Sequence, residues 1–399
     1  MDLREQRGME LEATRVIRKK KGVWLVPSQS GNNRYEVNIQ MATCTCLDHE
    51  TRGVKCKHIY AATFVMMREQ HADGSVTETI AVSETRRTYP QNWSAYNEAQ
   101  TKEQDKFQAL LADLCSGLAT NQPKTGRPRL PLSDAVFSIV FKVYSTVSQR
   151  RFVSDLREAH KRGYIAKVPH FNSISNYLKN PDLTPILRNL ITQSSLPLKS
   201  VETDFAVDSS GFATSRFTRW FDIKYGAIKT KQDWVKCHLM CGVKTNVVTA
   251  IEIHGQFASD AKMLPALVDT TAQNFHISEV AADKAYGSRK NTDAITKVGA
   301  DPFIAFKSDS VGAGGGTWAK MYHYFQFRRD EFLTHYHKRS NVESTFSMMK
   351  RKFGDSLRSK TDVAMINETL CKILCHNLVV LIHETHELGI DPVFWQNAA

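Results

Sequence analysis

Residues 336–353 read Tyr-His-Lys-Arg-Ser-Asn-Val-Glu-Ser-Thr-Phe-Ser-Met-Met-Lys-Arg-Lys-Phe, and they decide how the rest of the chain is interpreted. At about 100° per residue they predict one helix with two faces. One stripe contains two cations on either side of a carboxylate; it consists of Tyr336, Arg339, Glu343 and Lys350. A neighbouring apolar stripe predicts packing on a core; it consists of Val342, Phe346, Met349 and Phe353. Glu343 is therefore expected beside a core, where a carboxylate can bind a metal.

The same residues allow a simpler interpretation. Ser340 precedes Glu343 by three residues, which is the spacing of a capping box at the start of an ordinary amphipathic helix. This stretch alone leaves both interpretations open. Lys352 lies about 180° from Glu343 around the helix, so we expect it to face solvent and to contribute little to binding.

Composition narrows the class of partner. The chain has 399 residues, of which 42% are apolar and 24% charged, as in a soluble protein of two or three domains. Its net charge of +12 indicates nucleic acid, because clustered Lys and Arg release counterions when they bind phosphates. A membrane surface is the alternative for a basic protein. However, no apolar run reaches the ~18 residues of a membrane-spanning helix, and the first residues do not resemble a secretory signal. We therefore expect a cytoplasmic protein with no membrane partner.

Three of the eight cysteines form a metal-ligand pattern with a histidine. Cys44-Thr-Cys46 is followed by Cys56-Lys-His58, with a strand pattern before them and a helical pattern after them. Three thiolates and one imidazole are the ligands of a closed tetrahedral zinc site. The alternative is buried thiols beside a surface histidine. The pattern resembles the SWIM zinc finger, which implies structural Zn²⁺ in a region spanning residues 1–85. The other five cysteines lie among apolar residues, as buried thiols do in a reducing compartment.

The sequence pattern of residues 86–130 predicts a basic linker with helical patches. The linker ends in Gly126-Arg127-Pro128-Arg129, which looks like an AT-hook, an extended segment that places arginines in a narrow minor groove. Arg127 and Arg129 are then candidate DNA contacts. A plain basic linker explains the same residues.

Residues 131–198 predict a helical region. A short helix with a polar face carries four candidate contacts of a DNA reader of the helix-turn-helix type: Asn172, Ser173, Ser175 and Asn176. A helical dimerisation domain is equally compatible with this pattern.

In residues 199–399, two short apolar strands each end in an aspartate. Residues 203–208 lead to Asp208 and residues 279–283 lead to Asp283, each just before a turn. Functional sites collect at strand ends in α/β sheets, so we expect the two side chains to converge with Glu343. The predicted order is three strands, a helix, a strand, a helix, a strand and a helix. This order is that of an RNase H-like α/β fold, a mixed sheet flanked by helices.

The spacing of the opening stripe is Y(2)R(3)E(6)K, and the segment resembles the catalytic helix of insertion-sequence DDE transposases. Asp-Lys-Ala-Tyr at 283–286 is similar to that family's Asp-x-x-Tyr block, and the resemblance covers about residues 200–385. It implies that Asp208, Asp283 and Glu343 hold two catalytic Mg²⁺ ions, with Mn²⁺ as a substitute. Tyr336, Arg339 and Lys350 are then DNA contacts. The spacing between Asp283 and Glu343 is too short for the large β-rich insertion that some relatives carry.

These patterns predict a Mg²⁺-dependent DNA transposase with an N-terminal zinc finger and a helical DNA-binding region. Its expected partners are transposon terminal inverted repeats and target DNA at the nucleoid. Two ends imply a homodimer or a larger synaptic complex. Two other functions stay open: a non-catalytic DNA-binding regulator descended from a transposase, and a structure-selective RNase H-like nuclease without strand transfer.

Overall fold

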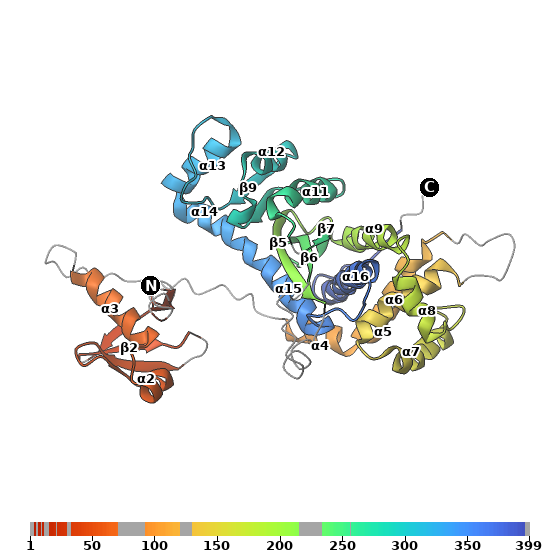
Figure 1. Ribbon diagram of the computed structural model, residues 1–399, viewed down its shortest axis with the longest axis horizontal. Helices are drawn as coiled ribbons and strands as arrows, with labels where there is room; N and C mark the ends of the chain where they lie inside the picture. The colour runs from red at the N-terminus through yellow and green to blue at the C-terminus, as the bar shows by residue number, and fades with distance from the viewer. Residues whose placement is uncertain are drawn as a thin grey trace, which may run out of the picture. The chain divides into compact units, whose positions relative to one another are not determined.

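The protein divides into two compact units, Met1–Gln91 and Asn92–Ala399, and each has its own core (Figure 1). The computed structural model describes residues 4, 7–8, 10–11, 16–20, 22–29, 33–70, 92–119, 130–214, 234–255 and 257–395.

Among its described residues, the first unit contains a small antiparallel sheet followed by two helices. The strands pair in chain order: β1 (Arg18–Lys20), β2 (Val23–Pro27), β3 (Arg34–Asn38) and β4 (Thr43–Cys44). The helices are α2 (Leu47–Arg52) and α3 (Lys57–Gln70). Alternate residues of β2, Trp24 and Val26, are buried against Val37 of β3. This core also contains Cys44, Cys46 and Cys56, so the cysteines pack where the strand pattern ends and the helix begins.

The second unit is built around a five-stranded mixed sheet in the order β7-β6-β5-β8-β9. Its strands are β5 (Asp204–Ala213), β6 (Trp234–Gly242), β7 (Val248–Gly255), β8 (Glu279–Ala282) and β9 (Asp301–Ile304). β6 is antiparallel to β5 and β7, whereas β8 is parallel to β5 and β9. The predicted hairpin is present between β6 and β7, with Asn246 in the left-handed region at φ 65°. The RNase H-like mixed sheet flanked by helices is confirmed.

Alternation along β5 sends side chains to two cores. Phe205 and Val207 pack under α11 (Asp260–Ala272) and near α12 (Arg289–Lys297). Ala206 and Phe212 face the opposite side, where α15 (Ser340–Phe353) and α16 (Asp362–Glu387) lie. Asp208 falls on this second face by the same period of two. The α15 face of the sheet is therefore the side on which the candidate site forms.

α16 is the central helix of the second core. It packs against helices α4, α5, α6, α9 and α15. By length and composition this 26-residue helix is apolar enough to cross a membrane, although 83% of its apolar window is buried inside the protein. The expectation that no run is long enough for a membrane span is thus corrected. The burial explains the apolar composition, because a helix surrounded by other helices is apolar on all sides.

The remaining helices before the sheet share the same core. They are α4 (Trp93–Thr101), α5 (Glu103–Ser116), α6 (Leu132–Ser145), α7 (Gln149–Lys161), α8 (Phe171–Leu178), α9 (Leu183–Ser195) and the 3₁₀ turn η1 (Leu196–Leu198). Phe107 of α5 and Phe141 of α6 belong to the same buried cluster as Leu374 of α16. The helical region at 131–198 therefore packs together with the sheet, while its boundaries as a domain remain a prediction.

The opening stretch forms three consecutive helical segments. After α13 (Gly316–Phe327), the chain forms α14 (Arg329–Tyr336), the 3₁₀ turn η3 (His337–Arg339) and α15. The single helix expected over 336–353 is thus corrected, because its first four residues lie in α14 and η3. The apolar stripe of α15 is buried as predicted.

Candidate active site

The two aspartates lie directly after the last paired residues of the neighbouring parallel strands β5 and β8. Val207 of β5 pairs with Ala282 of β8, so Asp208 and Asp283 come next on each strand. The expectation that β5 ends at Asp208 is wrong, because Ser209 to Ala213 continue to pair with β6. What ends at Asp208 is the pairing with β8. Asp283 begins the 3₁₀ turn η2 (Lys284–Tyr286), and its Oδ1 accepts a hydrogen bond of 2.7 Å from the Lys284 amide.

Glu343 comes to the same place from α15. The residue that caps α15 is Arg339, with a helical φ of −53° and no side-chain cap bond. The capping-box interpretation therefore does not describe this helix, since Ser340 lies inside it. Instead, Glu343 Oε1 lies 2.7 Å from the Arg339 guanidinium.

Arg339 lies between two of the carboxylates. Its Nη1 is also 3.3 Å from Asp208 Oδ2. Burial raises the pKa of Asp208, the Arg339 charge lowers it, and the charges of Asp283 and Glu343 raise it further. The charges of Asp283 and Glu343 thus both act on Asp208, and a site next to Asp208 favours a cation.

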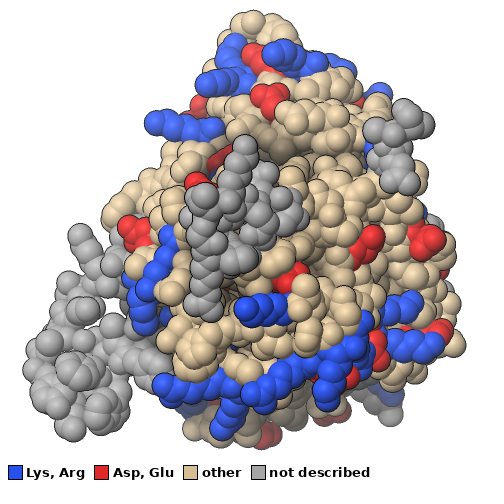
Figure 2. All heavy atoms as spheres, turned by 90° about the vertical axis from the view of Figure 1, so that its right-hand side faces the viewer, with Lys and Arg blue, Asp and Glu red and all other residues tan. Residues whose placement is uncertain are grey.

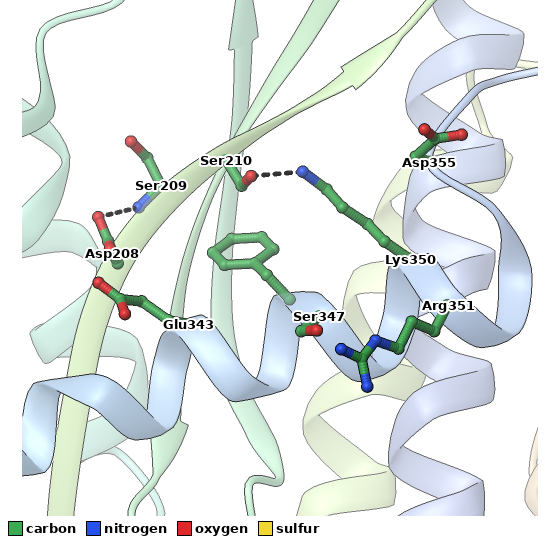
Figure 3. A pocket seen from close by; sticks show the side chains of 9 residues that line it. Asp208, Ser209, Ser210, Glu343, Ser347, Lys350, Arg351 and Asp355 are labelled. Atoms are coloured by element: carbon green, nitrogen blue, oxygen red, sulfur yellow. Dashed lines mark hydrogen bonds between the residues drawn. The ribbon is translucent and has the colours of Figure 1, made fainter. Parts of the chain in front are cut away.

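A groove of about 620 Å³ runs from these carboxylates along β5 and α15. Figure 3 shows Asp208 and Glu343 at one end of the groove and Lys350, Arg351 and Asp355 at the other. Lys350 donates a hydrogen bond of 2.6 Å to Ser210 Oγ, and burial lowers the pKa of this lysine. The groove therefore has an acidic end and an end with two basic side chains.

Of the opening stripe, Tyr336, Arg339 and Glu343 lie beside the aspartates, and Lys350 lies further along the groove. Tyr336 lies beside Asp283; its pKa is raised first by burial and also by that carboxylate. Its ring is 5.9 Å from the Arg339 guanidinium carbon. Arg127 and Arg129 of the AT-hook-like segment lie outside the described residues.

Lys338, which no sequence pattern singles out, fixes this helical segment to the sheet. Its Nζ lies 2.7 Å from Asp204 and 2.6 Å from Glu279, residues that begin β5 and β8. His335 Nδ1 is 2.6 Å from the other oxygen of Glu279. These contacts hold the residues just before Arg339 against both aspartate-bearing strands. These ion pairs join residues that are far apart in the sequence, so no local sequence pattern predicts them.

A buried polar network supports β5 from the opposite face. Ser209 donates a hydrogen bond of 2.9 Å to Asp260, which is also 2.7 Å from Lys236 and 3.3 Å from His238. The Tyr286 hydroxyl lies 3.3 Å from His238 Nδ1. Burial lowers the pKa of His238 to about 4, so the imidazole is neutral near pH 7. The network connects the residue after Asp208 to the turn after Asp283.

Lys352 is exposed, as expected, but it is paired with a carboxylate. Its Nζ lies 2.5 Å from Glu103 of α5, whose side chain is only 9% exposed. Glu103 also accepts a hydrogen bond of 2.6 Å from the Tyr144 hydroxyl. The helical-wheel angle placed Lys352 correctly away from Glu343, and on that side α5 supplies a buried carboxylate as its partner.

The first unit contains a four-ligand cluster. Potential ligand atoms of Cys44, Cys46, Cys56 and His58 all lie within 4.8 Å of one another, and the four residues are buried. His58 Nδ1 is 3.9 Å from Cys44 Sγ and 3.8 Å from Cys56 Sγ. Ligands of a tetrahedral zinc ion with bonds of ~2.3 Å are themselves ~3.8 Å apart, so the cluster fits Zn²⁺. The hydrogen bond between Cys44 and Cys56 lowers the pKa of Cys56 and raises the pKa of Cys44, so one thiolate is favoured within the pair and zinc has to displace the remaining thiol protons.

Two models of known families match the chain. The transposase DDE domain matches residues 199–378, which include all three carboxylates and the groove. The SWIM zinc finger matches residues 35–65, which include the four-ligand cluster. No curated protein and no solved structure matches the chain significantly. The chain therefore carries a transposase DDE domain preceded by an N-terminal SWIM zinc finger.

Proposed function

We propose that this protein is a DNA transposase that cleaves transposon ends and joins them to target DNA, with Asp208, Asp283 and Glu343 as its catalytic residues. One observation carries the proposal. Asp208 of one strand and Glu343 of a helix both contact Arg339 at the end of a groove, and the charge of Asp283, after the adjacent parallel strand, acts on Asp208. The family match implies DNA as the substrate.

The donor set suits Mg²⁺. Magnesium is a hard cation that prefers carboxylate and phosphate oxygens, and three carboxylates leave positions for substrate oxygens. The Arg339 guanidinium already lies between Asp208 and Glu343, which supports this place as a cation site. Two bound divalent ions would supply the chemistry that activates the nucleophile and stabilises the leaving oxygen.

The protein's other groups position the strand. With metal bound to the carboxylates, Arg339 would be free to contact a phosphate near the cleaved bond. Lys350, whose partner in the groove is a neutral hydroxyl, contacts a phosphate further along. Tyr336 stays beside Asp283 and fixes the orientation of that carboxylate. In this arrangement the groove accepts a single strand with its phosphates directed at α15.

The expected partners follow from the reaction. Transposon terminal inverted repeats and target DNA both have to reach the groove, so the protein works at the nucleoid in the cytoplasm. Two ends in one reaction require a homodimer or a larger assembly. Arg127 and Arg129 remain predicted minor-groove contacts.

A joining assay separates this function from its alternatives. A donor plasmid carrying the gene with its native flanking DNA is incubated with purified protein, Mg²⁺ and a target plasmid, and the junctions are sequenced. We expect the flanking DNA to be cut at fixed ends and joined to the target. Cutting without joining would indicate a structure-selective nuclease. Binding without cutting would indicate a regulator, and either result would contradict the proposal.

A further inference from the structure

Helix α7 presents an exposed stripe that contains three cations and no acid. Arg150, Ser154, Arg157 and Lys161 are spaced i, i+4, i+7 and i+11, and all four are exposed. The opposite side of α7 is buried through Phe152, Leu156 and Ala159. The acids of this helix, Asp155 and Glu158, lie outside the stripe, and Glu158 Oε1 is 3.2 Å from Arg162. Glu158 is also 4.0 Å from Lys161, which leaves Arg150 and Arg157 as the main charges of the stripe.

The stability of α7 does not account for these arginines. Arg150 and Arg151 lie in the first turn, which has no acidic residue. Cations at this end of a helix oppose the helix dipole and so destabilise the helix. A role outside the helix is therefore the better explanation for the charge.

α8 adds exposed amides next to this stripe. Asn172, Asn176 and Lys179 are exposed at i, i+4 and i+7, whereas Ile174 and Leu178 are buried. The two helices are fixed to each other where the stripes approach. The Arg150 guanidinium carbon lies 5.6 Å from the centre of the Phe171 ring, and Gln149 donates a hydrogen bond to Ser175 Oγ. Ser175 is thus a structural link, and Asn172 and Asn176 are the amides turned to solvent.

A series of cations connects this surface with the groove of the candidate active site. Lys350 and Arg351 line the groove. The loop that follows α15 carries Arg358, whose Nη1 donates a hydrogen bond of 3.1 Å to the carbonyl of Val147, just before α7. Figure 2, which shows the side on which α7 and α8 lie, has Lys and Arg side chains gathered along its lower part. Basic residues therefore extend from the groove to α7.

We propose that the α7–α8 surface, made of Arg150, Ser154, Arg157, Lys161, Asn172 and Asn176, binds the DNA duplex that flanks the cleaved bond. The α7 cations contact phosphates, which fixes position, and the two asparagines of α8 face base edges in the major groove. Asparagine makes a two-point hydrogen bond to adenine there, so α8 is the element that reads sequence. This inference rests on the proposed function and names the surface by which the substrate is recognised.

The phosphate contacts are tested by the salt dependence of binding. Fluorescence anisotropy follows a labelled 40-base-pair duplex of mixed sequence binding to the full chain without Mg²⁺. Each lost phosphate contact lowers the slope of log K against log salt by about 0.9. We expect Arg150→Ala with Arg157→Ala to lower the slope by about two, and the corresponding Arg→Lys pair to restore it. The matched control is Lys262→Ala with Lys297→Ala, exposed lysines on α11 and α12. Equal slopes for the arginine and control variants overturn the proposal.

The base contacts are tested by selection from a pool of random duplexes. We expect the wild type to enrich a common sequence, and Asn172→Ala with Asn176→Ala to lose that enrichment at an unchanged salt slope. Enrichment of the same sequence by the asparagine variant overturns the reading role of α8. If light scattering shows that the arginine variant loses a dimer while its slope stays normal, the surface is a dimer interface and the proposal is overturned.

Mg²⁺-dependent nicking of plasmid DNA by the same preparations separates the two proposals. A wild type that nicks DNA, with equal slopes in all variants, contradicts only the α7–α8 surface. A wild type that neither binds duplex nor nicks it contradicts both.

Discussion

Arg339 is the residue on which the charge of the candidate site depends. Its guanidinium contacts Asp208 and Glu343 at 3.3 and 2.7 Å, and the charge of Asp283 acts on Asp208 as well. Its positive charge thus lies where the carboxylates favour a cation. On this account Arg339 competes with metal before DNA arrives and binds phosphate afterwards.

Replacing Arg339 should therefore have opposite effects on two measurements. We expect Arg339→Ala to tighten Mn²⁺ binding to the DNA-free protein by about fivefold, equal to ~1 kcal/mol for one partly exposed ion pair. DNA cleavage should fall, because a phosphate contact is lost. Mn²⁺ titration followed by electron paramagnetic resonance gives the first value, and Arg339→Lys is the control that keeps the charge. Weaker Mn²⁺ binding by the alanine variant would show that the guanidinium supports the metal site instead.

At the scale of elements, strand and helix patterns predicted the catalytic region well. The position of Asp283 after β8, the β6–β7 hairpin and the buried stripe of α15 all follow from local periodicity. The length of β5 and the 3₁₀ turn before α15 do not follow from local periodicity. Pairing with β6 extends β5 beyond Asp208, and Lys338 ties η3 to the sheet. The convergence of the carboxylates was expected from strand ends, whereas the Ser209–Asp260 support on the opposite face depends on tertiary packing.

Helical periodicity does not predict the tertiary contact between Lys352 and Glu103. We expect Lys352→Met to lower the free energy of unfolding by about 1–3 kcal/mol, because the buried Glu103 carboxylate loses its cation. Urea unfolding of the full chain measures this change. Lys350→Ala, on the same helix, should cost little stability and instead lower the salt slope of DNA binding by about one. Similar stability losses for the two variants would contradict the different roles assigned to them.

At the scale of the whole molecule, the two units have separate cores and different sources of stability. The first unit has a small core that includes three buried cysteines, and a closed zinc site of this kind contributes directly to folding. The second unit is built around α16 and the mixed sheet. Their responses to loss of metal should therefore differ.

We expect a zinc chelator to unfold the first unit and leave the second folded. In hydrogen exchange followed by mass spectrometry on the full chain, peptides from 33–65 should lose protection. Peptides from β5 and α15 should keep theirs. Cys56→Ser should reproduce the effect without chelator, and Cys237→Ser, a buried thiol in the sheet, serves as the control. Unchanged protection of 33–65 after zinc removal would contradict a structural metal site.

The most direct test of the account is metal-dependent DNA cleavage by single-carboxylate variants. Asp208→Asn, Asp283→Asn and Glu343→Gln each keep the shape of the side chain and remove the charge that holds metal. Asp293→Asn, an exposed acid on α12, is the control. With Mg²⁺ in excess, we predict that each of the three variants loses cleavage by at least about 10³-fold while binding DNA as the wild type does, and that the control cuts normally. Cleavage at a wild-type rate by any one of the three would remove that carboxylate from the site and contradict the account.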